Sequence, residues 1–263
     1  MPRNTKEAKL AAFERLLDVM DTLREKCPWD RVQTNESLRP NTIEETMELA
    51  DAILADNPDE IRKELGDVLL HIVFYAKIGD EKNQFDIADV CNALCDKLIF
   101  RHPHVYGQEK ADSAAEVLQN WEVIKTKEKD GNKTILSGVP QALPSLIKAE
   151  RIQEKAANVG FDWEHKEDVW DKVKEEIAEV EAEMRRGGEA DIEKEFGDVF
   201  FAMVNAARLY GVRPDNALEK TNRKFISRFN YVERRAKEMD RHLRDMTLAE
   251  MDALWDEAKA KES

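Results

Sequence analysis

The sequence predicts an all-α protein in which one helical unit of about 110–130 residues occurs twice. Apolar residues recur at steps of three and four, for example from Leu65 to Ala76, and this is the period of an amphipathic helix. Only 10 glycines and 8 prolines interrupt the 263 residues, and the sustained alternating runs that predict strands are missing. Four acidic residues also recur with the same spacing in both halves of the chain.

Capping and proline signals place the helices of the first half. The N-terminal segment predicts a charged amphipathic helix. A helix over about residues 41–55 should end at the following turn, where Asn57 can cap the next helix and Pro58 suits its first turn. This next helix should run to about residue 79.

A stretch rich in charge, glycine and proline separates the two halves of the chain. Before it, a helix over about residues 86–100 should end near Pro103, because proline disfavours helical backbone in the residue before it. After it, a helix over about residues 144–158 should begin the second half. The expected domains are an N-terminal helical unit at residues 1–126, a linker at 127–143 and a C-terminal helical unit at 144–263.

The segments 45–67 and 176–198 carry the same acidic skeleton, with steps of three, sixteen and three between the acidic residues. Their apolar context matches as well, since residues 64–69 read ELGDVL and residues 195–200 read EFGDVF. Because the apolar context is shared as well, a chance match of acidic residues does not explain the pattern. We therefore infer a duplicated unit. The repeated residues are Glu45, Glu48, Glu64 and Asp67 in the first copy and Glu176, Glu179, Glu195 and Asp198 in the second.

Residues three apart project from one face of a helix, and a short turn would make the two acidic helices of each unit antiparallel neighbours. Four carboxylates would then face one another, and their repulsion disfavours the arrangement without cations. Mg²⁺ or Mn²⁺ takes oxygen ligands and keeps open positions for water and phosphate oxygens. Gly66 and Gly197, in the middle of these helices, suit a close approach of another backbone. The pattern therefore predicts a divalent cation site.

These and neighbouring residues also fit other interpretations. A glutamate-rich helix is usually a solvated face, but two matched copies favour a site. A di-iron bundle needs a glutamate three residues before a histidine, which none of the five histidines has. His102 and His104 can ligate metals, although ordering of the loop beside Pro103 is favoured. Cys91 and Cys95 lie one helical turn apart and are expected to face the core.

The net charge of −14 argues against a protein that coats a nucleic-acid polymer. Three cysteines do not suggest a disulfide framework, and the N-terminal segment lacks the apolar core of a signal peptide. The longest apolar runs fall far short of the ~18 residues that a membrane span needs. We therefore expect a cytoplasmic protein with neither a membrane nor a nucleic-acid partner.

Basic and aromatic residues follow the second acidic segment. Lys224 and Arg228 lie four apart on an expected helix, where ordinary surface charge is the simplest interpretation. Beside a carboxylate and magnesium site they are suited to binding phosphate oxygens. Trp255 can stack on a base or close the helical bundle, and both alternatives stay open.

Five short segments together resemble the two-repeat MazG nucleoside triphosphate pyrophosphohydrolases, which belong to the all-α NTP pyrophosphatase superfamily. The resemblance covers nearly the whole chain. The acidic skeleton is shared across the superfamily, whereas the CPWD and RHPHV segments and the tandem repeat point to MazG. The segments are CPWD at 27–30, EETME at 44–48, ELGD at 64–67, RHPHV at 101–105 and NVGFDW at 158–163.

The resemblance implies two MazG-like helical-bundle units completed by homodimerisation. It also implies cleavage of an NTP or dNTP between the α and β phosphates, dependent on Mg²⁺ or alternatively Mn²⁺, which gives the monophosphate and pyrophosphate. Activity in such proteins is usually placed in the C-terminal unit. The implied metal ligands are Glu176, Glu179, Glu195 and Asp198, with Glu45, Glu48, Glu64 and Asp67 as a weaker N-terminal set. The implied substrate contacts are Lys172, Lys224, Arg228 and Trp255.

Several points of the resemblance stay open. Glu175 is the candidate for the general base that takes a proton from the attacking water. Some relatives have a lysine where this chain has Asp191, and whether Lys194 supplies that phosphate contact instead is undecided. House-cleaning of aberrant nucleotides, or control of alarmone-linked nucleotide pools, is the physiological role that the resemblance suggests. The alternatives are a non-catalytic helical regulator that senses nucleotides or docks a partner, and a relative specific for dUTP or phosphoribosyl-ATP.

Overall fold

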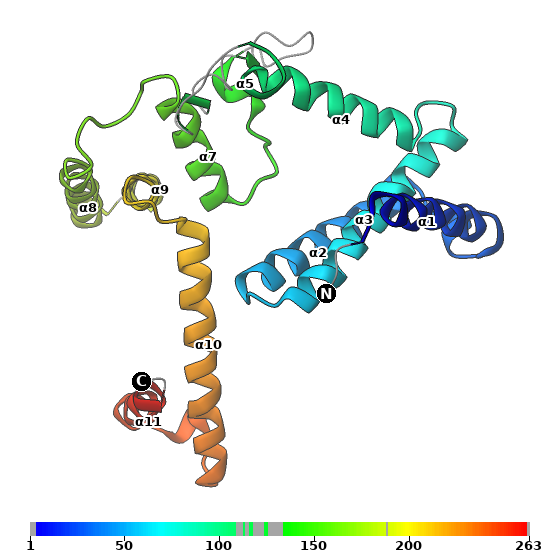
Figure 1. Cartoon of the computed structure of the whole chain (residues 1–263). Coiled ribbons are helices and arrows are strands. Elements are labelled where there is room, and N and C mark those ends of the chain that lie inside the picture. The colour runs from blue at the N-terminus through cyan, green and yellow to red at the C-terminus, as the bar shows by residue number, and fades with distance from the viewer. Residues whose placement is uncertain are drawn as a thin grey trace. The chain divides into compact units, whose positions relative to one another are not determined.

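The computed structural model describes residues 4–108, 113, 116–117, 124–125, 134–187 and 189–261. These residues form helices joined by short turns and include no β-strand, which confirms the all-α prediction (Figure 1). Contacts divide the chain into two compact units, Met1–Lys110 and Ala111–Ser263, called unit 1 and unit 2 below. Of the expected linker, residues 134–143 are described and include a short 3₁₀ helix, whereas residues 127–133 lie outside the described residues.

Unit 1 places its helices close to the predicted positions. Asn57 caps the third helix by accepting from the backbone N–H groups of Asp59 and Glu60, and Pro58 occupies the first turn. The helix before it begins earlier than expected, because Thr34 and Ser37 form a reciprocal cap. The elements are α1 (Lys6–Lys26), η1 (Asp30–Val32), α2 (Asn35–Leu54), α3 (Pro58–Glu81), α4 (Ile87–Arg101) and α5 (Pro103–Tyr106).

The core of unit 1 forms where α1, α2 and α3 meet. Met20, Leu38 and Phe74, one from each helix, are almost fully buried and belong to one cluster with Val73 and Ile78. The helix α4 contributes no buried residue to this core. The expectation that Cys91 and Cys95 face the core is therefore wrong, since both are exposed.

Unit 2 is built around the antiparallel pair α8 and α9. The first of these helices ends at Gly187, whose φ of 83° is the left-handed conformation that glycine adopts without strain. This turn lets α9 fold back along α8. The elements are η2 (Ile135–Gly138), α7 (Ser145–Ala157), α8 (Val169–Arg186), α9 (Glu189–Leu209), α10 (Pro214–Glu238), η3 (Leu243–Asp245) and α11 (Leu248–Lys261).

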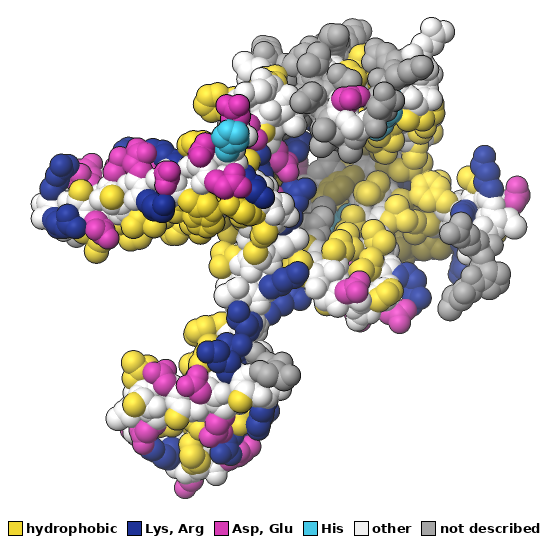
Figure 2. All heavy atoms as spheres, turned by 60° about the vertical axis from the view of Figure 1, so that its left-hand side comes forward, with side chains coloured by type: hydrophobic (Ala, Val, Ile, Leu, Met, Phe, Trp, Pro, Cys, Tyr) yellow, Lys and Arg dark blue, Asp and Glu magenta, His cyan; other side chains and the backbone are white. Residues whose placement is uncertain are grey.

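Two clusters of apolar side chains hold unit 2 together. Val173 of α8 packs with Ala202 and Ala206 of α9 in one cluster. At the far end of α10, Val232 and Leu254 form a second cluster that joins α10 to α11 (Figure 1). In both units many large apolar side chains also remain exposed, and Figure 2 shows them as yellow areas among the charged residues. None of the described helices is long and apolar enough to cross a membrane.

Candidate metal centre

The helices α8 and α9 bring three of the four predicted carboxylates of unit 2 together. Glu176 and Glu179 project from α8 and Glu195 from α9, and one oxygen of each lies within 4.8 Å of the others. Asp198 is outside this group, and its carboxylate is half exposed. The repeated spacing therefore predicted three members of the cluster correctly, while the structure leaves the fourth one turn further along α9.

The two most buried carboxylates of the cluster are Glu176 and Glu195, which are 6% and 8% exposed. Lys194 Nζ lies 2.9 Å from Glu195 Oε1, whereas Glu195 Oε2 is buried and has no hydrogen-bond partner among the described residues. A buried carboxylate oxygen without a partner is costly. An oxygen-rich site with an unsatisfied buried oxygen fits a hard divalent cation, so these residues fit Mg²⁺ or Mn²⁺.

The charges within the cluster shift the pKa values of Glu179 and Glu195 in opposite directions. The hydrogen bond with Glu195, together with desolvation, raises the pKa of Glu179 above its usual range. The Lys194 ammonium lowers the pKa of Glu195, because its hydrogen bond outweighs the opposing effect of desolvation. Without a cation the pair therefore holds a proton on Glu179 more readily than an isolated glutamate does.

Lys172, in the first turn of α8, binds two glutamates one turn further along the same helix. Its Nζ lies 2.6 Å from Glu176 Oε1 and 2.9 Å from Glu175 Oε1, and these hydrogen bonds raise the pKa of the lysine. The candidate base Glu175 is thus next to the cluster but outside it, with more than half of its side chain exposed. Lys172 is the one cation that touches both a cluster ligand and Glu175 within the described residues.

Unit 1 repeats the three-carboxylate cluster, with one buried member where unit 2 has two. Glu45, Glu48 and Glu64 also place one oxygen each within 4.8 Å of the others, and Glu64 Oε2 is buried with no partner in the described part of the chain. Lys63 Nζ lies 2.8 Å from Glu64 Oε1, as Lys194 does from Glu195. Sequence reasoning missed this role of Lys63, although the repeated Lys-Glu pair was visible in both copies.

One further feature distinguishes unit 1 from unit 2, and two others are shared. The repeat offset aligns position 172 with Asn41, so unit 1 has no counterpart of the lysine that binds Glu176. Asp67, like Asp198, lies outside the three-carboxylate group. Neither glycine of the repeated motif makes the expected close approach, since a Cβ added at Gly66 or Gly197 meets no described atom within 4 Å.

The other expected substrate contacts lie on α10 and α11. Lys224 and Arg228 are on α10, and the Arg228 guanidinium lies 5.6 Å from the centre of the Trp255 ring. Trp255 also contacts Phe225, with ring centres 5.0 Å apart, and packs on the cluster that joins α10 to α11. The three-carboxylate cluster takes its residues from α8 and α9 alone. Asp191 is exposed in the first turns of α9.

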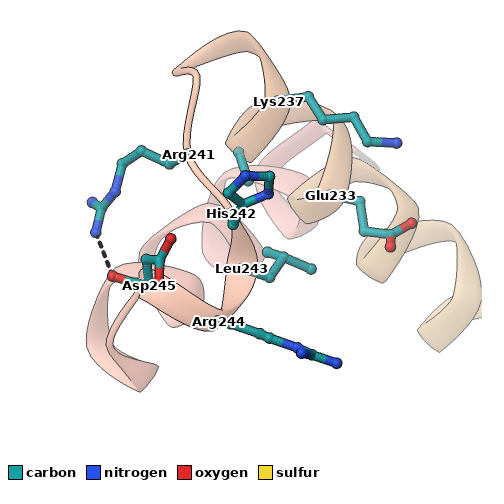
Figure 3. A pocket seen from close by; sticks show the side chains of 8 residues that line it. Glu233, Lys237, Arg241, His242, Leu243, Arg244 and Asp245 are labelled. Carbon is teal, nitrogen blue, oxygen red and sulfur yellow. Dashed lines mark hydrogen bonds between the residues drawn. The ribbon is translucent and has the colours of Figure 1, made fainter.

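Two other groups do not form a comparable site. His102 Nδ1 lies 2.6 Å from the Leu98 carbonyl oxygen, which agrees with a role in ordering the loop. A basic hollow at the end of α10 is lined by Arg241, Arg244 and Lys237 (Figure 3). There the Arg241 guanidinium donates to the Asp245 carbonyl and to Glu250, so its donors already have acceptors within the protein.

Comparison with known proteins identifies the family. The sequence model of the MazG nucleotide pyrophosphohydrolase domain matches residues 33–106 and 165–233. The chain is 43% identical over 257 residues to the nucleoside triphosphate pyrophosphohydrolase of Escherichia coli K12, which covers 95% of this chain and 98% of that protein. This chain belongs to the MazG family.

Two other relatives match most of the chain, and one of them carries the MazG name. The nucleoside triphosphate pyrophosphohydrolase/pyrophosphatase MazG of Thermotoga maritima is 43% identical over 251 residues, with 94% of this chain and 95% of that protein covered. The protein YabN of Bacillus subtilis is 44% identical over 90% of this chain but only 49% of its own length. Each MazG domain match contains one copy of the acidic skeleton, so the duplication inferred from the carboxylates coincides with two MazG domains.

Proposed function

We propose that this MazG protein hydrolyses nucleoside triphosphates between the α and β phosphates, with a divalent cation held by the carboxylates of unit 2. The products are the nucleoside monophosphate and pyrophosphate. The observation that carries the proposal is the unit 2 cluster, in which Glu176 and Glu195 are buried and Glu195 Oε2 lacks a partner among the described residues. Two relatives that match over nearly the whole chain are named for this reaction.

The positions of the side chains support the following roles. Glu176, Glu179 and Glu195 hold the cation, and Asp198 is the further carboxylate one turn along α9. A bound Mg²⁺ neutralises phosphate charge and lowers the pKa of a coordinated water. The bound cation offsets the negative charge of the cluster, which lowers the free-energy cost of burying Glu176 and Glu195.

Glu175 and Lys172 complete the proposed chemistry. The carboxylate of Glu175 is exposed, so it can take a proton from water, and Lys172 Nζ lies 2.9 Å from its Oε1. The Lys172 side chain is 40% exposed, so its ammonium can leave the cluster and bind a phosphate oxygen. Asn41 cannot supply this cation in unit 1, which is why we assign catalysis to unit 2 and a cation site to unit 1.

Homodimerisation is part of the proposal. The helices α8 and α9 leave Ile177, Phe196 and Phe200 exposed, although such large apolar side chains gain free energy when water is excluded from them. A second copy that packs on this face would bury these residues. In such a dimer, a site shared between the two copies can include Lys224, Arg228 and Trp255. We further propose a cytoplasmic house-cleaning role in nucleotide pools.

A pyrophosphate-release assay over all NTPs and dNTPs tests the proposed activity. We expect release with Mg²⁺ or Mn²⁺ and none in EDTA. Absence of release from every nucleotide, although nucleotides bind, would instead support the regulator that senses nucleotides. Turnover of dUTP or phosphoribosyl-ATP alone would support the corresponding specific relative. Sedimentation of the purified protein tests the dimer, which a monomer at micromolar concentration would contradict.

A further inference from the structure

One contact between a lysine and a glutamate is common to the two carboxylate clusters. Lys63 Nζ lies 2.8 Å from Glu64 Oε1 in unit 1, and Lys194 Nζ lies 2.9 Å from Glu195 Oε1 in unit 2. In both glutamates Oε2 is buried and has no hydrogen-bond partner within the described residues. The shared contact therefore occupies one oxygen, leaves the other one for a cation, and does not distinguish the two clusters.

A second ammonium group contacts the cluster of unit 2 alone. Lys172 Nζ lies 2.6 Å from Oε1 of the buried Glu176, and the two residues are one helical turn apart on α8. The equivalent residues of unit 1 are Asn41 and Glu45 on α2. Asn41 carries no charge, and Glu45 forms no ion pair with a basic side chain in the described part of the chain. Lys172 is therefore an additional positive charge that unit 1 lacks.

This lysine gives the two sites different net charges. Four carboxylates and two contacting ammonium groups leave the unit 2 set at −2, whereas four carboxylates and one ammonium group leave the unit 1 set at −3. Glu44 and Glu175 occupy equivalent positions, so they do not alter this difference. Among sites with oxygen ligands, the affinity for a divalent cation depends on the charge of the ligands. The charges therefore favour unit 1 as the tighter site for a free cation.

Burial acts in the opposite direction, because Glu176 is buried and Glu45 is only partly buried. A less polar environment strengthens the attraction between a carboxylate and a cation. At Glu176, however, the Lys172 ammonium already offsets the carboxylate charge at hydrogen-bond distance. A unit charge within ~5 Å of a divalent cation changes the dissociation constant of the cation by about tenfold, even in water-like surroundings. Lys172 therefore decides the order of the two affinities.

A triphosphate relieves the repulsion that Lys172 causes. The lysine side chain is 40% exposed, so its ammonium can turn from Glu176 to a phosphate oxygen. Phosphate oxygens are also the usual further ligands of Mg²⁺ at sites that have few protein carboxylates. Cation binding in unit 2 should therefore be tighter in the presence of a triphosphate than in its absence. Unit 1 has no lysine at this position and needs no such partner.

We propose that Lys172 makes cation binding in unit 2 depend on the triphosphate, whereas unit 1 retains a divalent cation in the absence of nucleotide. Unit 1 is thus a resident cation site, and unit 2 takes up its cation with the substrate. The inference rests on the assignment of catalysis to unit 2 and of a cation site to each unit. It adds the order in which the two sites fill and the residue that sets this order.

Titration of the nucleotide-free protein with Mn²⁺ tests the order, with the free ion followed by its electron paramagnetic resonance signal. We expect two classes of site in the wild type. Glu64→Gln should remove the tighter class, and Glu195→Gln should remove the weaker class. Lys172→Met should tighten the weaker class about tenfold. Asn41→Lys, which introduces the lysine of unit 2 into unit 1, should weaken the tighter class about tenfold.

Lys174→Met is the matched control, because Lys174 is also on α8 but contacts Asp171 and not the cluster. It should leave both dissociation constants within about twofold of the wild type. Three results would overturn the inference: loss of the tighter class in Glu195→Gln, a single class of site in the wild type, or an unchanged dissociation constant in either charge variant. Circular dichroism checks that each variant is folded.

This titration also separates the inference from the proposed function. It contains no nucleotide, so its outcome does not depend on turnover. A wild type that releases no pyrophosphate but shows the expected classes of Mn²⁺ site would contradict the proposed function and support the order of filling. A wild type that releases pyrophosphate but binds Mn²⁺ more tightly in unit 2 would do the reverse.

Discussion

The contact between Arg208 and Asp162 should be a major source of stability in unit 2. Arg208 Nη1 donates to Asp162 Oδ2 at 3.0 Å and Nη2 donates to Oδ1, while the two side chains are 14% and 27% exposed. Hydrogen bonds to charged groups contribute about 1.5–3 kcal/mol, and breaking a fully buried pair costs about 3–5 kcal/mol. Because solvent reaches Asp162, we expect Arg208→Met to lower the free energy of unfolding by about 2–3 kcal/mol.

Thermal unfolding followed by circular dichroism measures this effect. For a chain of this size, a loss of about 2–3 kcal/mol lowers Tm by roughly 4–12 °C. A double-mutant cycle with Asp162→Asn should give a coupling free energy of about 1–2 kcal/mol. A Tm within about 1 °C of the wild type, or a coupling near zero, would refute the reasoning.

The same pair predicts a dependence on pH. Burial alone would raise the pKa of Asp162, but hydrogen bonds from Arg208 and from the Trp163 N–H lower it below its usual value. A carboxyl with a lowered pKa in the folded state stabilises the protein above the pKa of the unfolded state, near 4, and this stabilisation is lost as pH falls through the lower folded value. The difference between the wild type and Arg208→Met should therefore be constant from pH 6 to 8 and shrink below about pH 4. A difference that stays unchanged at pH 3 would contradict this.

Three further predictions concern the cation sites and the core. Lys172→Met should lower kcat/KM about 10–100-fold, as expected for the loss of one charged contact to a phosphate, whereas Asn41→Met should leave it unchanged in the same steady-state assay. Mn²⁺ at 100 times its Kd should stabilise the protein by about 2.7 kcal/mol, seen as a higher Tm, and Glu195→Gln should reduce this gain. Phe74→Ala should cost about 3–5 kcal/mol in urea unfolding, because the ring is 2% exposed. A loss below about 1 kcal/mol would show that Phe74 does not fill the unit 1 core.

Local signals were sufficient to predict most of the helices from the sequence. Asn57 and Pro58 act within one turn of the helix that they begin, so the boundary between α2 and α3 could be placed without the fold. The repeated spacing also predicted that three of the four carboxylates meet, since Glu176 and Glu179 share a face of α8 and a short turn brings Glu195 opposite. These features depend on the helical period and on one glycine turn, both of which are visible in the chain.

Other features depend on how each helix is oriented and packed against its neighbours, which the helical period of the sequence does not determine. Asp198 has the expected spacing from Glu195 but lies outside the three-carboxylate group. Cys91 and Cys95 are on an apolar helix, yet α4 buries no residue against the described part of unit 1. The contact between Asp162 and Arg208 joins two residues that lie 46 positions apart in the sequence. No local pattern predicts such a contact.

Product analysis of three proteins tests the central claim most directly. Phosphorus NMR can follow a nucleoside triphosphate with Mg²⁺ in the presence of the wild type, Glu176→Gln or Glu45→Gln. We predict that the wild type and Glu45→Gln release equal amounts of nucleoside monophosphate and pyrophosphate, and that Glu176→Gln releases neither while it keeps its helical circular dichroism. Formation of nucleoside diphosphate and orthophosphate by the wild type, or undiminished turnover by Glu176→Gln, would contradict the account.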